Sequence, residues 1–313
     1  MAEITVLMPT YNRPEHLSAA LETLAGQFER EVPFSVVVVD DGSVPAVELD
    51  PGAFPFRLIF LRLEKNCGRS AARNAGLALV DSPLVVFLDD DMRVLPGFIR
   101  AYQEAIDPAG RAVGLGSVCF HPDIPRDALT RYLETRGIAK LKADEPIPFR
   151  YFLTYNSAVP TFLLREAGGF SERVRAWGGE DIELAWRLQK HGARFVRVPQ
   201  ARAYHAHRRR LEDVLSLSES FARECMPVLF DEDPVFTTQL RADLLGPVRY
   251  AKRNRWKRNA IRFVTTPCIS HRVEALVKRH LGARWPMWVF DYLIASAWRR
   301  GLDQAHARGE EQE

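Results

Sequence analysis

Two kinds of hydrophobic pattern alternate along the first 120 residues. Continuous apolar runs are typical of parallel strands that are covered on both faces, and apolar residues three or four positions apart are typical of helices. The pattern predicts strands over residues 4–9, 35–39, 58–63, 84–88 and 113–120, and helices over residues 15–28, 70–79 and 97–106. This alternation predicts an α/β fold with a doubly wound, mostly parallel sheet.

The pattern is weaker in the middle of the chain. Residues 121–148 are polar, contain proline and predict no clear element. The apolar stretch 155–164 contains Pro160, which lacks a backbone N–H, so we expect an edge strand or a loop there. A helix is predicted over residues 181–191 and a strand over 195–199, and the rest of the chain is expected to be mainly helical.

Acidic side chains directly follow two of the predicted strands. One strand runs into Asp-Asp-Gly-Ser at 40–43, and another runs into three aspartates at 89–91. Ligands of doubly wound sheets bind beyond the carboxyl ends of the strands. Mg²⁺ and Mn²⁺ prefer carboxylate oxygens and also bind phosphates, so Asp89 and Asp91 suit a metal diphosphate. The alternative is an acidic loop that caps the helix after Pro96.

Four motifs, in their order along the chain, resemble the family 2 glycosyltransferases. They are Pro-Thr-Tyr-Asn-Arg at 9–13, Asp-Asp-Gly-Ser at 40–43, an N-x-G-x-x-x-A-R-N-x-G pattern at 66–76, and the D-x-D pair at Asp89 and Asp91. The resemblance covers about residues 4–210 and implies the GT-A fold, which is Rossmann-like.

This resemblance also implies an organisation of the chain. A glycosyltransferase domain is expected over 1–210, with a nucleotide-sugar half at 1–120 and an acceptor half at 121–210. Residues 211–313 lie outside the resemblance and are expected to form a mainly helical, basic C-terminal extension.

Donor-binding residues are implied at the same motifs. They are Thr10, Tyr11, Arg13, Asp40, Asp41, Asn66, Gly68, Arg73, Asp89 and Asp90. Asp40, and after it Asp41, can accept a hydrogen bond from the imide N–H of a uracil-type base, against which Tyr11 presents its ring. Arg73 can bind a phosphate or carboxylate, or tie the loop to the sheet. Ordinary packing of Tyr11 and a turn-forming role for Asn66 stay open.

A divalent metal, Mn²⁺ or Mg²⁺, is the cofactor that the resemblance implies. Its expected ligands are Asp89, Asp91 and His205, since a neutral imidazole is an acceptable partner for Mn²⁺. His207 is the competing candidate, and a purely structural histidine is the alternative for either position.

A pair of acids begins the helix predicted over 181–191. Trp-Gly-Gly-Glu-Asp at 177–181 leads into it, and the resemblance implies Asp181 as the catalytic base of an inverting enzyme, with Glu180 binding the acceptor or supporting the base. The helix dipole favours a carboxylate at this end, so we expect Asp181 to stay anionic at neutral pH. The alternative is that Asp181 only caps the helix.

The back of the chain is basic. Residues 241–300 contain fourteen Lys or Arg against three acids, whereas residues 1–240 carry a net charge of −5. The aromatic stretch 285–298 is too short to span a bilayer, which takes about 20 residues. It suits an interfacial helix on an anionic membrane, or a helix packed on the catalytic domain. No nucleic-acid partner is expected, because no recognised nucleic-acid-binding module accompanies the charge.

Composition bounds the class and location of the protein. The 313 residues are 47% hydrophobic, which excludes disorder, and four scattered cysteines without a C-x-x-C pair are typical of a reducing compartment. The first residues lack the pattern of a signal peptide, so we expect a cytoplasmic protein, with attachment to the cytoplasmic face of a membrane as the open alternative.

Three functions remain after these exclusions. The resemblance implies an inverting, metal-dependent transfer of a sugar from a nucleotide-diphosphate donor, a UDP-sugar by the Asp40 position, to a hydroxyl of a saccharide or lipid-linked glycan. A nucleotidyltransferase of similar architecture needs a basic, Gly-rich phosphate loop, which residues 9–13 do not supply. The third is a non-catalytic scaffold that binds an anionic polymer or membrane. The donor sugar, the acceptor, the linkage and the oligomeric state are left open.

Overall fold

One eight-stranded sheet organises the first part of the computed structural model. Its strand order is β3-β2-β1-β4-β7-β6-β8-β5. The strands are β1 (Ile4–Thr10), β2 (Phe34–Asp40), β3 (Arg57–Arg62), β4 (Leu84–Leu88), β5 (Met92–Val94), β6 (Ala112–Phe120), β7 (Asn156–Pro160) and β8 (Arg194–His205). The structure describes residues 3–28, 33–142, 145–246 and 255–310.

The sheet is mixed, with a parallel half that carries the N-terminal motifs. β1 pairs in parallel with β2 and β4, β2 with β3, and β6 with β8, whereas β7 runs antiparallel between β4 and β6, and β5 runs antiparallel to β8. The parallel strands β1, β2 and β4 are buried on both faces, as their continuous apolar runs predict. The expected α/β architecture is confirmed, and the expected strands and helices of the first 120 residues are present to within two residues.

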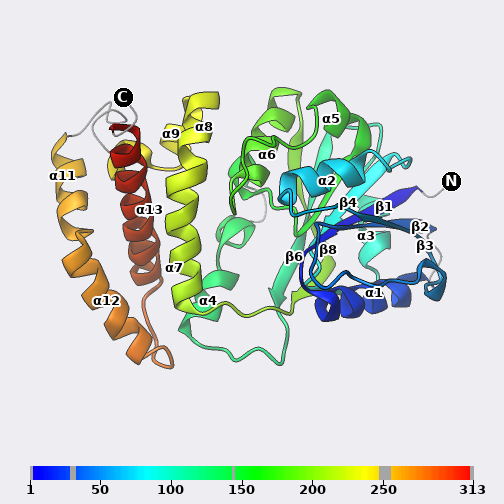
Figure 1. Cartoon of the computed structure of the whole chain (residues 1–313), viewed down its shortest axis with the longest axis horizontal. Coiled ribbons are helices and arrows are strands. Elements are labelled where there is room, and N and C mark those ends of the chain that lie inside the picture. The colour runs from blue at the N-terminus through cyan, green and yellow to red at the C-terminus, as the bar shows by residue number, and fades with distance from the viewer. Residues whose placement is uncertain (1–2, 29–32, 143–144, 247–254, 311–313) are drawn as a thin grey trace. The chain divides into compact units, whose positions relative to one another are not determined.

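Helices cover both faces of the parallel half (Figure 1). They are α1 (Pro14–Phe28), α2 (Arg69–Leu77), α3 (Phe98–Ala105), α5 (Thr161–Glu166) and α6 (Glu180–Lys190). The leucines of α1 join Val6 and Val36 in one hydrophobic core, which α3 also enters. On the opposite face α2 lies so close to β1 that a Cβ on Gly76 would stand 2.2 Å from Leu7 Cδ1. This close approach brings the start of α2 to the carboxyl ends of the strands.

The expectation of an edge strand or loop over 155–164 is wrong. β7 is a fully buried central strand, and Pro160 is its last residue, opposite Leu84. A proline at that end leaves the other hydrogen bonds of the ladder intact, because the chain turns at once into α5. The strand expected over 195–199 is also longer than predicted, since β8 runs on to His205.

The chain divides into two compact units. Unit 1 comprises Met1–Ile124, Arg136–Glu172 and Glu180–His207, and unit 2 comprises Pro125–Thr135, Arg173–Gly179 and Arg208–Glu313. The sheet and its helices belong to unit 1. Among the described residues, three short 3-10 turns lie at Pro51–Ala53, Gly137–Lys140 and Phe149–Tyr151.

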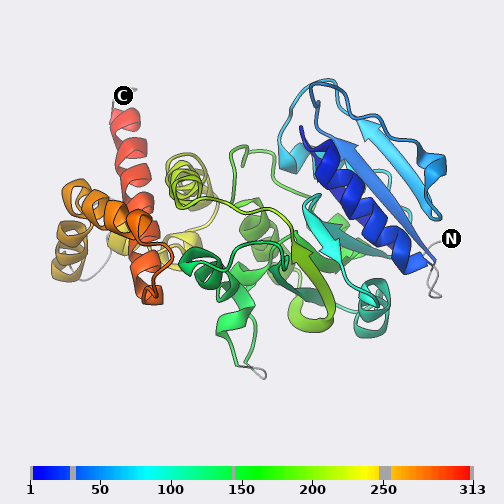
Figure 2. The ribbon, with the colours of Figure 1, turned by 90° about the horizontal axis from the view of Figure 1, so that it is seen from below.

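Unit 2 is helical, as expected for most of its length. Its helices are α4 (Ala128–Glu134), α7 (Leu211–Ser220), α8 (Met226–Glu232), α9 (Val235–Gln239), α10 (Ala242–Leu245), α11 (Arg255–Val264), α12 (Pro267–Arg279) and α13 (Met287–Glu310), with a π-helical turn at Phe221–Cys225. Within the unit, α11 and α12 lie along one side of α13 (Figures 1 and 2).

The aromatic stretch 285–298 forms the start of α13 and supplies the core of unit 2. Val289, Phe290 and Leu293 are buried there. Phe290 stacks on Tyr132 with 4.9 Å between ring centroids, and the Tyr132 hydroxyl donates to Asp291 Oδ1 at 2.8 Å. Packing inside unit 2 therefore buries one side of this stretch, as the packed-helix alternative expects, whereas Met287 and Trp288 stay exposed. No helix in the described ranges is long and apolar enough to cross a membrane.

Candidate functional site

A buried arginine joins three of the sequence motifs. Arg73, on α2, donates from Nη2 to Asp89 Oδ1 at 3.1 Å and from Nη1 to Glu180 Oε1 at 3.3 Å. Its guanidinium lies 5.4 Å from the centre of the Phe170 ring. Burial alone would lower the pKa of Arg73, but the surrounding carboxylates raise it above its ordinary value. The sequence leaves two roles open for Arg73, ligand binding and a structural link. Its contacts within the protein link the motifs to one another.

The start of α6 presents two carboxylates. Glu180 is buried, and Asp181 is half-buried and accepts a 2.8 Å hydrogen bond from the Thr154 hydroxyl. Burial and the charge of Glu180 raise the pKa of Asp181 to about 7. Desolvation thus opposes the helix dipole, which we expect to favour the anionic form of Asp181. A carboxyl with this pKa is well matched to accept a proton near neutral pH.

The aspartate run after β4 is bound by residues of the loop after β1. The Thr10 hydroxyl donates to Asp90 Oδ2 at 2.8 Å, and Arg13 Nη1 donates to Asp91 Oδ2 at 3.0 Å. Burial and the neighbouring Asp91 raise the pKa of Asp90 to about 7. Burial acts in the same direction on Asp91, but His205 and Arg13 outweigh it and lower the pKa of that carboxyl. Residues 9–13 and 89–91 thus form one polar cluster.

A metal ion fits one part of this cluster. His205 Nε2 lies 3.4 Å from Asp91 Oδ1, and that oxygen is buried without a hydrogen-bond donor. An imidazole nitrogen facing an unsatisfied carboxylate oxygen suits Mn²⁺ or Mg²⁺. Asp89 instead accepts from Arg73, and in the described ranges no three or more His, Cys, Asp or Glu side chains are already gathered as a metal site. The ring of His207 contacts those of His205 and His16.

The acids after β2 are held by the protein itself. Asp40 is fully buried, with Oδ1 accepting from the Ser43 N–H at 3.0 Å and Oδ2 accepting from Arg62 Nη1 at 2.9 Å. Asp41 accepts from the backbone N–H groups of Cys67 at 2.7 Å and Gly68 at 2.9 Å. Burial raises the pKa of Asp41 although both bonds oppose it. These bonds join the loop after β2 to the start of the 66–76 motif.

Two donor-binding candidates are exposed at this edge. Tyr11 is 43% exposed, so core packing does not account for it, and Asn66 is also exposed. The backbone at Asn12 has a left-handed φ of 54°, and its N–H donates to Ser43 Oγ at 2.8 Å. The loops that carry Tyr11 and the Asp40-Asp41 pair are therefore tied together.

The sequence did not predict several contacts of the site. Arg62 stands opposite Asp40 in the β2–β3 register. Thr154 reaches Asp181 from a segment without a predicted element. Asn74 donates to the Phe170 carbonyl at 2.9 Å and accepts from its N–H at 2.8 Å. The Asn74 position inside the 66–76 motif is a signal that could have identified the last of these, whereas nothing in the sequence pattern points to Thr154.

Comparison with known proteins places the chain among sugar-transferring enzymes. The family model Glycosyl transferase family 2 matches residues 5–159, and the model N-terminal domain of galactosyltransferase matches residues 139–209. The chain is 32% identical over 219 residues to validoxylamine A glucosyltransferase of Streptomyces hygroscopicus subsp. limoneus, covering 60% of this chain and 48% of that protein. It is 28% identical over 237 residues to chondroitin synthase of Escherichia coli, covering 64% and 34%. The chain thus spans half or less of these relatives' length.

Solved structures show the same fold at low identity. The mannosyltransferase PcManGT from Pyrobaculum calidifontis, in complex with GDP-Man and Mn²⁺, has a TM-score of 0.57 at 20% identity and covers 96% of this chain and 88% of its own. S. aureus TarS 1–349 in complex with UDP has a TM-score of 0.53 at 19% identity and covers 99% and 92%. These likenesses show the GT-A fold. Together with the family models and the motif order, they place this chain in the family 2 glycosyltransferases.

Proposed function

We propose that this protein is an inverting glycosyltransferase that moves a sugar from a nucleotide-diphosphate donor to a hydroxyl acceptor. The observation that carries the proposal is the network in which Arg73 bonds both Asp89 and Glu180, because it joins the D-x-D motif to the acids at the start of α6. A transferase needs a donor diphosphate and a proton acceptor close together, and this network puts the groups for both in unit 1.

Asp181 is the proposed general base. Its carboxylate takes the proton of the acceptor hydroxyl as the oxygen attacks the anomeric carbon, and the diphosphate leaves from the opposite face. One such displacement inverts the anomeric centre. The Thr154 hydroxyl, 2.8 Å from Asp181 Oδ1, stabilises the ionised form and orients the carboxylate. The charge of Glu180, at the adjacent position, raises the pKa of Asp181 and so makes it a stronger base.

Asp91 and His205 are the proposed metal ligands, through Oδ1 and Nε2, with Asp89 beside them. A bound Mn²⁺ or Mg²⁺ would neutralise charge on the leaving diphosphate. Arg13 and Thr10 hold the aspartate run in place for this purpose. The crystallised mannosyltransferase relative contains Mn²⁺, which supports a divalent metal here.

The donor is proposed to be a UDP-sugar, bound at the loops after β1 and β2 and at the start of α2. The exposed Tyr11 ring can lie against the base, with Asp40, Asp41, Asn66 and Gly68 around it. Both carboxylates already accept bonds from the protein, so a base N–H would take one of their remaining lone pairs. The TarS relative binds UDP and the mannosyltransferase GDP-Man, so the nucleotide base is the first property to measure. The proposed acceptor is a saccharide or a lipid-linked glycan at the cytoplasmic face of a membrane.

Calorimetric titration with UDP, GDP and TDP, with and without Mn²⁺, tests the proposal. We expect one nucleotide to bind in a Mn²⁺-dependent way, and Asp91→Ala to abolish that dependence. Asp123→Ala is the matched control, because the Asp123 side chain is 89% exposed. Absence of nucleotide binding at any metal concentration would contradict the transferase. Binding of a nucleoside triphosphate with release of diphosphate would instead favour the nucleotidyltransferase.

A further inference from the structure

The outward surface of α11 and α12 exposes large apolar side chains. On α11, Trp256 and Phe263 are each 69% exposed and Val264 is 46% exposed. On α12, Ile269 and Leu276 are exposed as well. Side chains of this size are normally buried, and a run of them across two consecutive helices marks an interaction surface.

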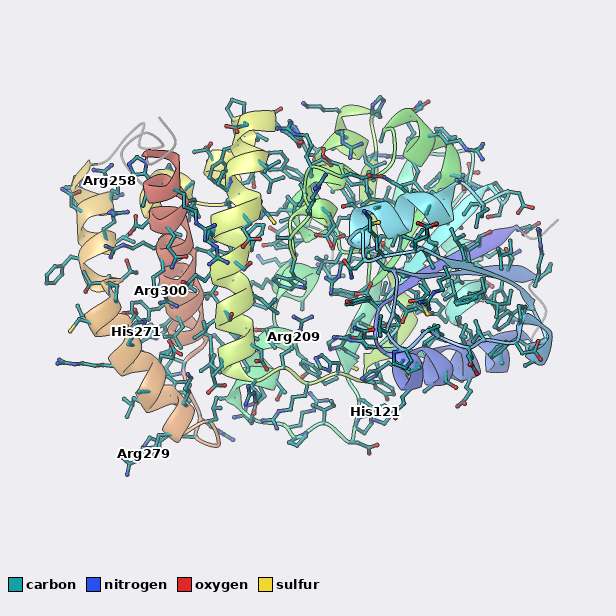
Figure 3. All side chains as sticks on the ribbon, in the orientation of Figure 1. His121, Arg209, Arg258, His271, Arg279 and Arg300 are labelled. Atoms are coloured by element: carbon teal, nitrogen blue, oxygen red, sulfur yellow. The ribbon has the colours of Figure 1, made fainter. Side chains whose placement is uncertain are left out.

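Internal packing sets which faces of these helices point outward. Arg262 of α11 donates to Asp303 of α13 at 3.0 Å, and Val277 of α12 is buried in the core to which α13 contributes. By the helical repeat, Trp256 and Phe263 share one side of α11, and the buried Arg258 lies on the other side. Figure 3 shows Arg279 projecting from the end of α12.

Cations alternate with the apolar residues on this surface. Lys257 lies over the Trp256 ring at 5.6 Å, and Arg272 and Arg279 are exposed on α12. The sequence of α11 contains no acid, and the single acid of α12 is Glu274, which pairs with Lys278 at 2.7 Å. We call this surface the basic aromatic face, and it consists of Trp256, Lys257, Phe263, Val264, Ile269, Arg272, Leu276 and Arg279.

We propose that the basic aromatic face docks on an anionic lipid bilayer. Tryptophan and phenylalanine insert favourably at the headgroup level, while lysine and arginine are attracted to anionic lipid. A second copy of the same face would bring like charges together, which disfavours a symmetric dimer. Cations and stacking aromatic rings would also recognise nucleic acid. Nucleic acid, however, has no apolar surface that would cover Val264, Ile269 and Leu276.

This inference extends the proposed function, since it names the surface through which the enzyme reaches a membrane, but it uses residues outside the catalytic network. Its test therefore needs no sugar transfer. A protein that binds vesicles without transferring sugar would contradict the proposed function alone, and one that transfers sugar without binding vesicles would overturn this inference alone.

Vesicle flotation of the full chain provides the test. We expect binding to vesicles of phosphatidylcholine mixed with phosphatidylglycerol, weaker binding in added salt, and little binding to phosphatidylcholine alone. Arg272→Glu combined with Arg279→Glu should weaken binding about thirtyfold or more. Arg194→Glu with Arg202→Glu, at two exposed arginines of β8, makes the same change in net charge and should leave most of the binding intact.

Insertion of the aromatic residues gives a second readout. Brominated lipids should quench the tryptophan fluorescence of the bound wild type, and Trp256→Phe should remove much of that quenching while binding persists. Equal binding to neutral and anionic vesicles, no binding at all, or unchanged binding of the Arg272/Arg279 variant would overturn the inference. Binding to polyglutamate or DNA but not to vesicles would overturn it too, and would indicate a macromolecular partner.

Discussion

Asp181 has a protonation state that is set by competing local effects. Burial and the adjacent Glu180 favour the neutral acid, while the charge of Arg73, the Thr154 bond and the position at the start of α6 favour the anion. Burial and the charge of Glu180 prevail and raise the pKa of Asp181 to about 7. A proposed base with a raised pKa binds protons more readily than an ordinary aspartate.

Asp181→Asn should lower kcat by about 10²–10⁴ while leaving the Kd of the nucleotide unchanged, because the amide cannot accept the acceptor's proton. Steady-state transfer assays and calorimetry on the same preparation measure both quantities. Asp123→Asn, at a highly exposed aspartate, serves as the control. Turnover within tenfold of wild type would rule out Asp181 as the base.

The pH dependence follows from the same residue. The base acts only when deprotonated, so log kcat should fall with falling pH below about 7 and level off above it. Thr154→Val removes the hydrogen bond that lowers this pKa, and it should move the acid limb to higher pH by about one unit. A limb that stays in place in this variant would show that another group controls the rate.

At the scale of elements, α2 links the sheet to the loop that follows α5. Gly76 allows the helix to approach Leu7 closely, and consecutive positions of the same helix present Arg73 and Asn74. Asn74 bonds both backbone groups of Phe170 and also donates to Glu172 at 2.9 Å. The Phe170 ring then lies beside the Arg73 guanidinium. The loop and the buried arginine are therefore positioned together.

Asn74→Ala should lower the free energy of unfolding of unit 1 by about 1–3 kcal/mol, because it leaves the Phe170 N–H and carbonyl without their partner. Urea denaturation measures this change. Asn259→Ala, at an exposed position of α11, removes the same side chain without such bonds and should change stability by less than about 0.5 kcal/mol. Equal losses in the two variants would contradict the linking role of Asn74.

At the scale of the whole molecule, each unit has buried apolar packing of its own. In unit 1, one core lies between the sheet and helices α1 and α3. In unit 2, a core is built from α4, α7, α12 and α13, including Tyr132 and Phe290. The charge is also distributed unequally, because the basic segment 241–300 belongs to unit 2. The groups proposed for transfer and those proposed for membrane docking therefore lie in different units.

Phe290→Ala should destabilise unit 2 by about 3–5 kcal/mol, because it empties a buried site and removes the stacking on Tyr132. Hydrogen exchange followed by mass spectrometry should show faster exchange across α7, α12 and α13, with little change in β1, β2 and β4. Phe263→Ala, at a 69% exposed position, should leave exchange nearly unchanged. Equal acceleration in both units would show that the two cores unfold as one.

The sequence by itself determined the elements and motifs that depend on local pattern. Continuous apolar runs identify β1, β2 and β4, since a strand buried on both faces has no polar side. The acids after β2 and β4 meet at one edge of the sheet, because parallel neighbours end on the same side. Motif order was enough to identify the family.

Only the tertiary structure decided the partners that come from distant segments. The place of β7 in the centre of the sheet, the Arg62 bond to Asp40 and the Thr154 bond to Asp181 depend on strand order and register. The burial of Val289, Phe290, Leu293 and Ala297 depends on which helices pack against them. A protein core and a membrane both remove apolar surface from water, so the pattern of 285–298 could not tell which of its side chains pack inside the protein; the structure stacks Phe290 on Tyr132 and leaves Trp288 exposed.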